Sequence, residues 1–269
     1  MIIYVMYHDE KSHQKAIELC QEWESNLKLI IQSIEKTDQV EEYLRLDNFH
    51  FSPINVPCTP FLESGTYLSL LEKFDEWKNE DYVGLVTYSI IDKLTFFLKK
   101  QMSLNWFTIL KETYKKKADA IGIFGLSFCR SNTIISLLEG SVFQHGYNYY
   151  NAWRSLLQSM GYTMDKIDYD NDLGIFCNWW FTKPVLLKEY CLFLIKAMRN
   201  VNENPKLKDI FERNAHYETG NINEEKKMEL FKKPYYTIHP FVFERLLSFF
   251  LAQKDNISIG CVTKMYMKL

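Results

Sequence analysis

Ile2-Ile3-Tyr4-Val5-Met6-Tyr7 is a short apolar run that ends in the polar turn His8-Asp9-Glu10. The apolar side chains that follow the turn recur at helical spacing, at Ala16, Ile17, Cys20 and Trp23. An apolar run of this length predicts a buried strand, and the later spacing predicts an amphipathic helix. The amino-terminal residues are therefore expected to form a strand, a loop and a helix.

The same alternation continues along the chain. Further strands are expected at residues 27–31, 82–88, 118–124, 176–181 and 257–265, and helices at 67–77, 105–116, 147–160, 185–195, 205–213 and from Pro240. Apolar strands alternating with helices indicate a mostly parallel sheet that is covered on both faces. We therefore expect an α/β fold in which residues 1–269 form one domain with a mostly parallel central sheet flanked by helices. Ligands of such sheets bind beyond the carboxyl ends of the strands.

Composition narrows the class of protein. The chain has 269 residues, 47% of them hydrophobic, and 32 basic against 34 acidic side chains give a net charge of −2. This mixed charge argues against nucleic acid as a partner. No apolar run is long enough to span a bilayer, residues 2–7 lack the basic start of a signal peptide, and the six cysteines have no paired spacing. We expect a soluble cytoplasmic protein with free thiols.

Common cofactor signatures are missing from the sequence. There is no Gly-x-Gly-x-x-Gly after the first strand, no Walker A lysine loop, no His-Glu-x-x-His and no nucleophile elbow. Their absence argues against a dehydrogenase, methyltransferase, kinase, zinc protease or ordinary hydrolase.

Phe176-Cys177-Asn178-Trp179-Trp180-Phe181 suggests carbohydrate chemistry. The amide of Asn178 offers donors and an acceptor beside flat aromatic faces, a combination that suits a polyhydroxylated ring. The alternative is that Asn178 is a hydrogen-bonded polar group in a buried strand and that the tryptophans belong to the core.

Two further positions could hold phosphate groups. Hydroxyl groups end the strand at 82–88 and Lys93 follows, so Lys93 could neutralise a diphosphate leaving group. The alternative is that Lys93 is a surface lysine.

Glu244 and Arg245 are adjacent charges in the apolar run 240–250, and burying either charge alone is costly. Arg245 could clamp a phosphate and Glu244 could act as a base. The alternative is a structural ion pair.

Asp168-Tyr169-Asp170-Asn171-Asp172 carries three carboxylates in five residues. An Asp-x-Asp pair can hold Mg²⁺ or Mn²⁺ against a nucleotide diphosphate, because these cations prefer oxygen ligands. The alternative is a solvated acidic turn.

Taken together, residues 2–4 with 8–12, Tyr82 to Tyr88, Cys177-Asn178-Trp179-Trp180, and Pro240 to Ser248 resemble glycosyltransferases of large DNA viruses, phages and bacterial polysaccharide clusters. That family is of the GT-A type, a single Rossmann-like domain that takes a sugar from a nucleotide diphosphate donor. The resemblance implies a nucleotide-binding half at about residues 1–130 and an acceptor-side half at about 131–269.

The resemblance also implies site residues. Tyr7, His8 and Asp9 would lie near the nucleotide, Tyr88 and Lys93 near the diphosphate, and Asn178 and Trp179 near the transferred sugar. No Asp-x-Asp ends the strand at 82–88, so the enzyme is expected either to use Mn²⁺ or Mg²⁺ or to replace the metal ion with Lys93 or Arg245. Glu244 and Asp170 are the candidate catalytic bases.

The sequence therefore favours a soluble glycosyltransferase of glycan biosynthesis that moves a sugar from a nucleotide-diphosphate sugar to a glycan or another hydroxyl acceptor. If the chain is viral, its location would be the host cytoplasm. The alternative is a glycan-binding or assembly protein that kept the fold without turnover. A third hypothesis, glycosylation of modified DNA bases, is disfavoured because the sequence indicates no basic face.

Overall fold

The computed structural model describes residues 1–34, 49–90, 92, 116–131, 133–168, 174–175, 179–217 and 222–268. Its strands are β1 (Ile2–Tyr7), β2 (His50–Asn55), β3 (Val83–Thr87), β4 (Ala120–Arg130), β5 (Thr133–Ile135), β6 (Gly174–Ile175), β7 (Trp180–Thr182) and β8 (Ile259–Lys268). Its helices are α1 (Glu10–Ile34), the 3₁₀ helix η3 (Leu62–Gly65), α2 (Thr66–Glu72), α3 (Phe74–Trp77), α6 (Leu137–Ser159), α7 (Met164–Ile167), α8 (Pro184–Glu203), α9 (Pro205–Phe211), α10 (Glu224–Phe231) and α11 (His239–Ala252).

The fold is α/β, as predicted, but the sheet is mixed. Its strand order is β2-β1-β3-β7-β4-β5, and β6 and β8 also pair with β4. Parallel pairing forms the longer ladders, which join β1 to β2 and β3, and β4 to β8. Antiparallel pairing forms the short ladders, which join β7 to β3 and place β5, β6 and β7 along one side of β4.

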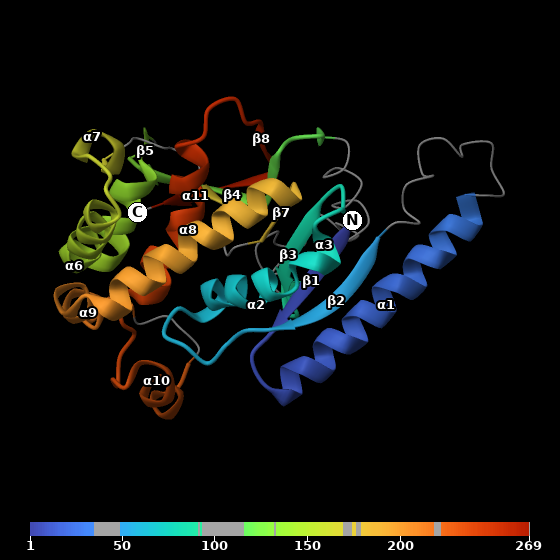
Figure 1. The fold of residues 1–269 in the computed structure, drawn as a ribbon, viewed down its shortest axis with the longest axis horizontal. Coiled ribbons are helices and arrows are strands. Elements are labelled where there is room, and N and C mark those ends of the chain that lie inside the picture. The colour runs from blue at the N-terminus through green and yellow to red at the C-terminus, as the bar shows by residue number, and fades with distance from the viewer. Residues whose placement is uncertain are drawn as a thin grey trace.

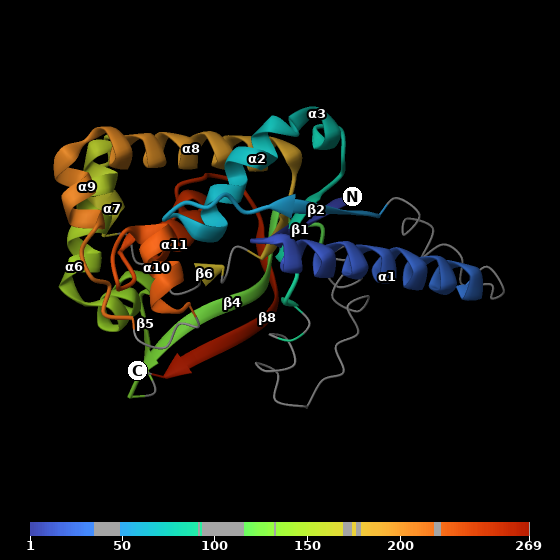
Figure 2. The same cartoon turned by 90° about the horizontal axis from the view of Figure 1, so that it is seen from below.

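Helices cover the sheet on the side where Tyr4 and Trp180 point. The Tyr4 hydroxyl donates to Glu76 Oε2 of α3 at 3.1 Å, and the Trp180 indole donates to the Tyr67 hydroxyl of α2 at 2.8 Å. Figure 2 shows α8, α2 and α3 together along this side, and Figure 1 shows α1 running alongside β2. The ring of Trp23 in α1 packs edge-on against Phe51 of β2, with ring centroids 5.3 Å apart.

Three predicted elements differ from the structure. The helix expected at residues 67–77 is divided at Lys73 into α2 and α3. The strand expected at residues 27–31 is wrong, because those residues continue α1. Helix propagation adds a hydrogen bond for each residue, and no glycine or proline interrupts the spacing that begins at Ala16. The helix expected from Tyr147 begins earlier, at Leu137, and bends at Gly146, whose φ of 72° and ψ of −174° are not helical.

Strand β2 was not predicted, because Pro53 interrupts its pattern. Proline cannot donate to a ladder, so it is found mainly in edge strands. β2 is the end strand of the order given above, and Pro53 lies opposite Val5. The helix expected at residues 105–116 lies outside the described residues except for Lys116.

Gly84 allows β7 to pack against β3. A Cβ at residue 84 would lie 2.5 Å from Phe181 Cε1 and 3.2 Å from Ile3 Cγ1. The Gly84→Ala substitution is therefore expected to lower the free energy of unfolding by about 1–3 kcal/mol, measured by urea denaturation. Gly260→Ala is the matched control, because its Cβ would meet the flexible Lys116 side chain at 3.3 Å. Equal stability of the two variants would contradict this account of the β3–β7 contact.

Candidate functional site

The carboxyl ends of β1 and β3 form the candidate site. From β1 the chain passes through α1 to β2 on one side, and the next strand, β3, pairs with the opposite side of β1. The connections thus diverge at β1, and in open α/β sheets ligands bind outside the carboxyl ends of the strands at such a switch point. The residues that follow these two strands are His8 and Asp9 after β1, and Tyr88 and Ser89 after β3.

Asp9 and Ser12 form a capping box at the start of α1. The Asp9 carboxylate accepts from the Ser12 backbone N–H at 2.8 Å, and the Ser12 hydroxyl accepts from the Asp9 backbone N–H at 2.9 Å. This reciprocal pair satisfies the backbone donors that a helix start leaves unpaired. The Ser12 backbone N–H, followed by its hydroxyl, holds the pKa of Asp9 below its usual value. Asp9 therefore orients the turn that carries His8.

Aromatic and cationic side chains converge at the β1–β3 edge. The ring centroids of His8 and Tyr88 are 6.3 Å apart at an interplanar angle of 77°, and Lys15 Nζ lies 6.0 Å from the centroid of Tyr88. Beside them Tyr7 stacks on His13 with centroids 4.2 Å apart. His8 and Lys15 are exposed and Tyr88 is partly buried. The edge thus presents flat ring faces and a cation to solvent.

The structure brings together Tyr7, His8, Asp9 and Tyr88, which the sequence predicted as donor-binding residues. It also adds Ser12, His13 and Lys15, which the sequence reasoning missed. Ser12 could have been found, because Asp-x-x-Ser before a helix matches the spacing of a capping box. Lys93, Asn178 and Asp170 lie outside the described residues, so their predicted roles stay predictions.

Trp179 lies next to the carboxyl end of β3. Strand β7 is antiparallel to β3 with Trp180 opposite Leu85, so the residue before Trp180 reaches this edge of the sheet. The Trp179 side chain is 0% exposed, and its ring centroid lies 5.9 Å from that of Phe124. In this position the ring supports the edge from the core, and its predicted contact with a sugar stays a prediction.

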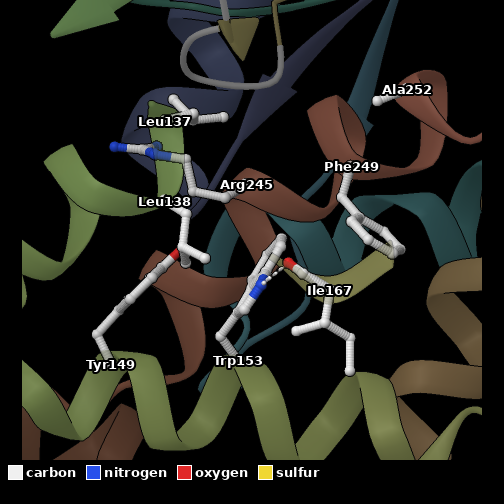
Figure 3. A pocket seen from close by; sticks show the side chains of 8 residues that line it. All are labelled: Leu137, Leu138, Tyr149, Trp153, Ile167, Arg245, Phe249 and Ala252. Atoms are coloured by element: carbon white, nitrogen blue, oxygen red, sulfur yellow. Dashed lines mark hydrogen bonds between the residues drawn. The ribbon is translucent and has the colours of Figure 1, made fainter. Parts of the chain in front are cut away.

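Glu244 and Arg245 form an ion pair within α11. Arg245 Nη1 lies 2.8 Å from Glu244 Oε2, and the Arg245 side chain is only 6% exposed. Arg245 lines a small cavity between α6 and α11, with Tyr149, Trp153 and Phe249 (Figure 3). The cavity holds about 20 Å³, which is room for about one water molecule. This arrangement matches the structural alternative for the pair, and the predicted contact of Arg245 with a phosphate stays a prediction.

No group of three or more histidine, cysteine or acidic side chains that could hold a metal ion occurs among the residues described by the structure. Asp168, the first carboxylate of the acidic segment, accepts from the Tyr150 hydroxyl at 3.3 Å. Among the same residues, every helix is too short or too polar to traverse a lipid bilayer.

Comparison of the chain with protein-family models, curated proteins and solved structures finds no match. The resemblance to glycosyltransferases therefore stays a prediction, and the geometry of the β1–β3 edge is the basis for assigning a function.

The capping box can be tested apart from any ligand. Asp9→Ala and Ser12→Ala should each lower the free energy of unfolding by about 1 kcal/mol, because each removes one half of the cap. Since both act on one hydrogen-bonded unit, the double variant should cost less than the sum, as measured by chemical denaturation. The pKa of Asp9 is lowered, so its stabilisation is present above the pKa of an unfolded aspartate and is lost as the pH falls through the folded value. Additive losses would contradict the reciprocal cap.

The lowered pKa values of two buried histidines predict how the free energy of unfolding depends on pH. Burial lowers the pKa of His145 to about 3, with a smaller contribution from Arg245, and burial likewise lowers the pKa of His239 to about 3. Below about pH 6.5 the unfolded chain binds protons that the folded chain does not, so stability falls as the pH falls towards 3. The expected slope is about 1.4 kcal/mol per pH unit for each histidine. Denaturation of His145→Gln between pH 6.5 and 5 should show a shallower slope than wild type, and parallel slopes would contradict the assignment.

Proposed function

We propose that this protein is a glycosyltransferase that moves a sugar from a nucleotide-diphosphate sugar to a glycan or another hydroxyl acceptor. The observation that supports the proposal best is the convergence of the His8 and Tyr88 rings with Lys15 at the switch point between β1 and β3. Ring faces suit a nucleoside and a cation suits the phosphates beside it. The sequence resemblance pointed to His8 and Tyr88, although not to Lys15, independently of this geometry.

In the proposed complex the nucleoside stacks against His8 and Tyr88, and the donor phosphates face the amino terminus of α1. The aligned peptide dipoles of this 25-residue helix favour negative charge near its first turn. The capping box keeps the turn in one conformation, so the rings need less ordering when the donor binds. These residues bind and orient the donor.

The proposal leaves the catalytic base with Glu244 or Asp170. In the folded chain Glu244 is paired with Arg245 through Oε2 at 2.8 Å. The binding experiment described in the next paragraphs, carried out with and without metal, tests the requirement for Mn²⁺ or Mg²⁺. We further propose that the chain is a single Rossmann-like domain of the GT-A type, that its acceptor binds on the carboxyl-terminal half, and that the protein acts in the cytoplasm.

Binding tests the proposal directly. Thermal unfolding of the wild-type chain should shift upward with at least one nucleotide or nucleotide sugar from a panel, because a ligand that binds only the folded state stabilises that state. Tyr88→Ala removes a ring from the edge and should weaken this binding by about tenfold, and Tyr147→Ala is the matched control. The Tyr147 ring is 69% exposed on α6 rather than at the carboxyl ends of β1 and β3.

The panel is measured with and without Mn²⁺. If no nucleotide or nucleotide sugar stabilises the chain in either condition, the proposal is wrong. If a glycan binds and no nucleotide does, the chain is a glycan-binding protein rather than a transferase.

A further inference from the structure

Helix α10 (Glu224–Phe231) approaches the carboxyl ends of β1 and β2, although it lies far from both strands in the sequence. The Cys58 thiol, three residues after β2, donates to Glu229 Oε1 of α10 with a sulfur–oxygen distance of 3.2 Å. The helix is capped at its amino terminus by Asn223, whose side chain accepts from the Lys226 backbone N–H at 2.9 Å. The α10 corner, defined as Cys58, Lys226 and Glu229, thus joins α10 to the segment that follows β2, and Asp9 after β1 lies within electrostatic range of Lys226.

Lys226 occupies the centre of the α10 corner. Its ammonium nitrogen lies 2.9 Å and 2.8 Å from the two carboxylate oxygens of Glu229. The hydrogen bond to Glu229 raises the pKa of Lys226 most, and Asp9 and Cys58 raise it further through space. Lys226 is therefore linked through Glu229 to Cys58, the residue that follows β2 in the α10 corner.

The charges at the α10 corner suit the replacement of the Glu229 carboxylate by a ligand anion at Lys226. The Lys226 side chain is 42% exposed and that of Glu229 is 53% exposed, so a ligand can reach both. The Asp9 carboxylate is engaged by the capping box, which leaves Glu229 as the anion that Lys226 can exchange. Lys232 at the end of α10 adds a second cation, which acts on both Cys58 and Glu229.

We propose that Lys226 binds the phosphates of the donor, leaving Glu229 when the ligand arrives. This inference rests on the proposed function, because the ligand is the diphosphate of the donor bound at the β1–β3 edge. A lysine ammonium binds phosphate as a point charge, and a hydrogen bond between two charged groups is stronger than one between neutral groups. Lys226 thereby provides the cation that the sequence reasoning sought in Lys93 or Arg245.

Lys227 provides a matched control on the same helix. Its ammonium nitrogen lies 4.8 Å from the centroid of the Tyr236 ring, which directs it to a different neighbour from Lys226. Substitution of either lysine by alanine removes one positive charge from α10, so the two variants share the change in net charge and in helix composition. They differ in the position of the lost charge relative to Asp9 and Cys58.

Isothermal titration with inorganic pyrophosphate tests the inference. Lys226→Ala should weaken pyrophosphate binding at least tenfold relative to wild type, because a charge-assisted hydrogen bond to phosphate is lost. Lys227→Ala should change the affinity less than twofold. Glu229→Gln should strengthen binding two- to fivefold, because it removes the carboxylate that competes for Lys226.

The outcomes separate the inference from the proposed function. If a nucleotide stabilises wild type but pyrophosphate does not bind, the role of Lys226 is overturned and the proposed function stands. The same conclusion follows if a nucleotide stabilises wild type and pyrophosphate binds equally well to wild type and to Lys226→Ala. Equal losses in Lys226→Ala and Lys227→Ala also overturn it, because general charge would then explain both. If wild type binds neither a nucleotide nor pyrophosphate, both proposals are wrong.

Discussion

The contact between Phe181 of β7 and Gly84 of β3 joins the two parallel parts of the sheet. Strand β7 is only three residues long, yet it pairs with β3 on one side and with β4 on the other. The Phe181 ring lies where a side chain of residue 84 would be, and the neighbouring Trp180 indole donates to Tyr67 on the opposite face. A short strand can hold this position because it is buried on both faces, and all three of its residues are at most 1% exposed.

The position of β7 has consequences for the carboxyl edge. Because β7 runs against its neighbours, its start lies beside the end of β3, and this places the buried Trp179 behind Tyr88. The same edge receives the capped start of α1 and, from far along the chain, helix α10, whose Glu229 accepts from Cys58 after β2. Backbone geometry therefore gathers rings and cations from segments that no local sequence pattern links.

Local patterns were sufficient for much of the fold. The apolar run before His8 predicted β1, the spacing from Ala16 predicted α1, and Pro184 and Pro240 were placed at the starts of two helices, as observed. Local sequence patterns gave wrong predictions where the tertiary context overrides the secondary-structure propensity of a segment. Residues 27–31 were predicted to form a strand but lie within helix α1, whose formation is cooperative. Strand β2 was not predicted because proline is unfavourable in strands other than edge strands, and β2 contains Pro53.

For the candidate site, the sequence by itself determined that Tyr7, His8, Asp9 and Tyr88 lie at the carboxyl ends of strands, and strands of a parallel sheet end at one edge. It also required Glu244 and Arg245 to be paired or to reach a cleft, since an isolated buried charge is too costly. Only the tertiary structure decided that these two side chains pair with each other at 2.8 Å, that the Trp179 ring turns into the core, and that Glu229 of α10 contacts Cys58 after β2. These outcomes depend on contacts between distant segments, which are fixed by packing and strand order rather than by periodicity.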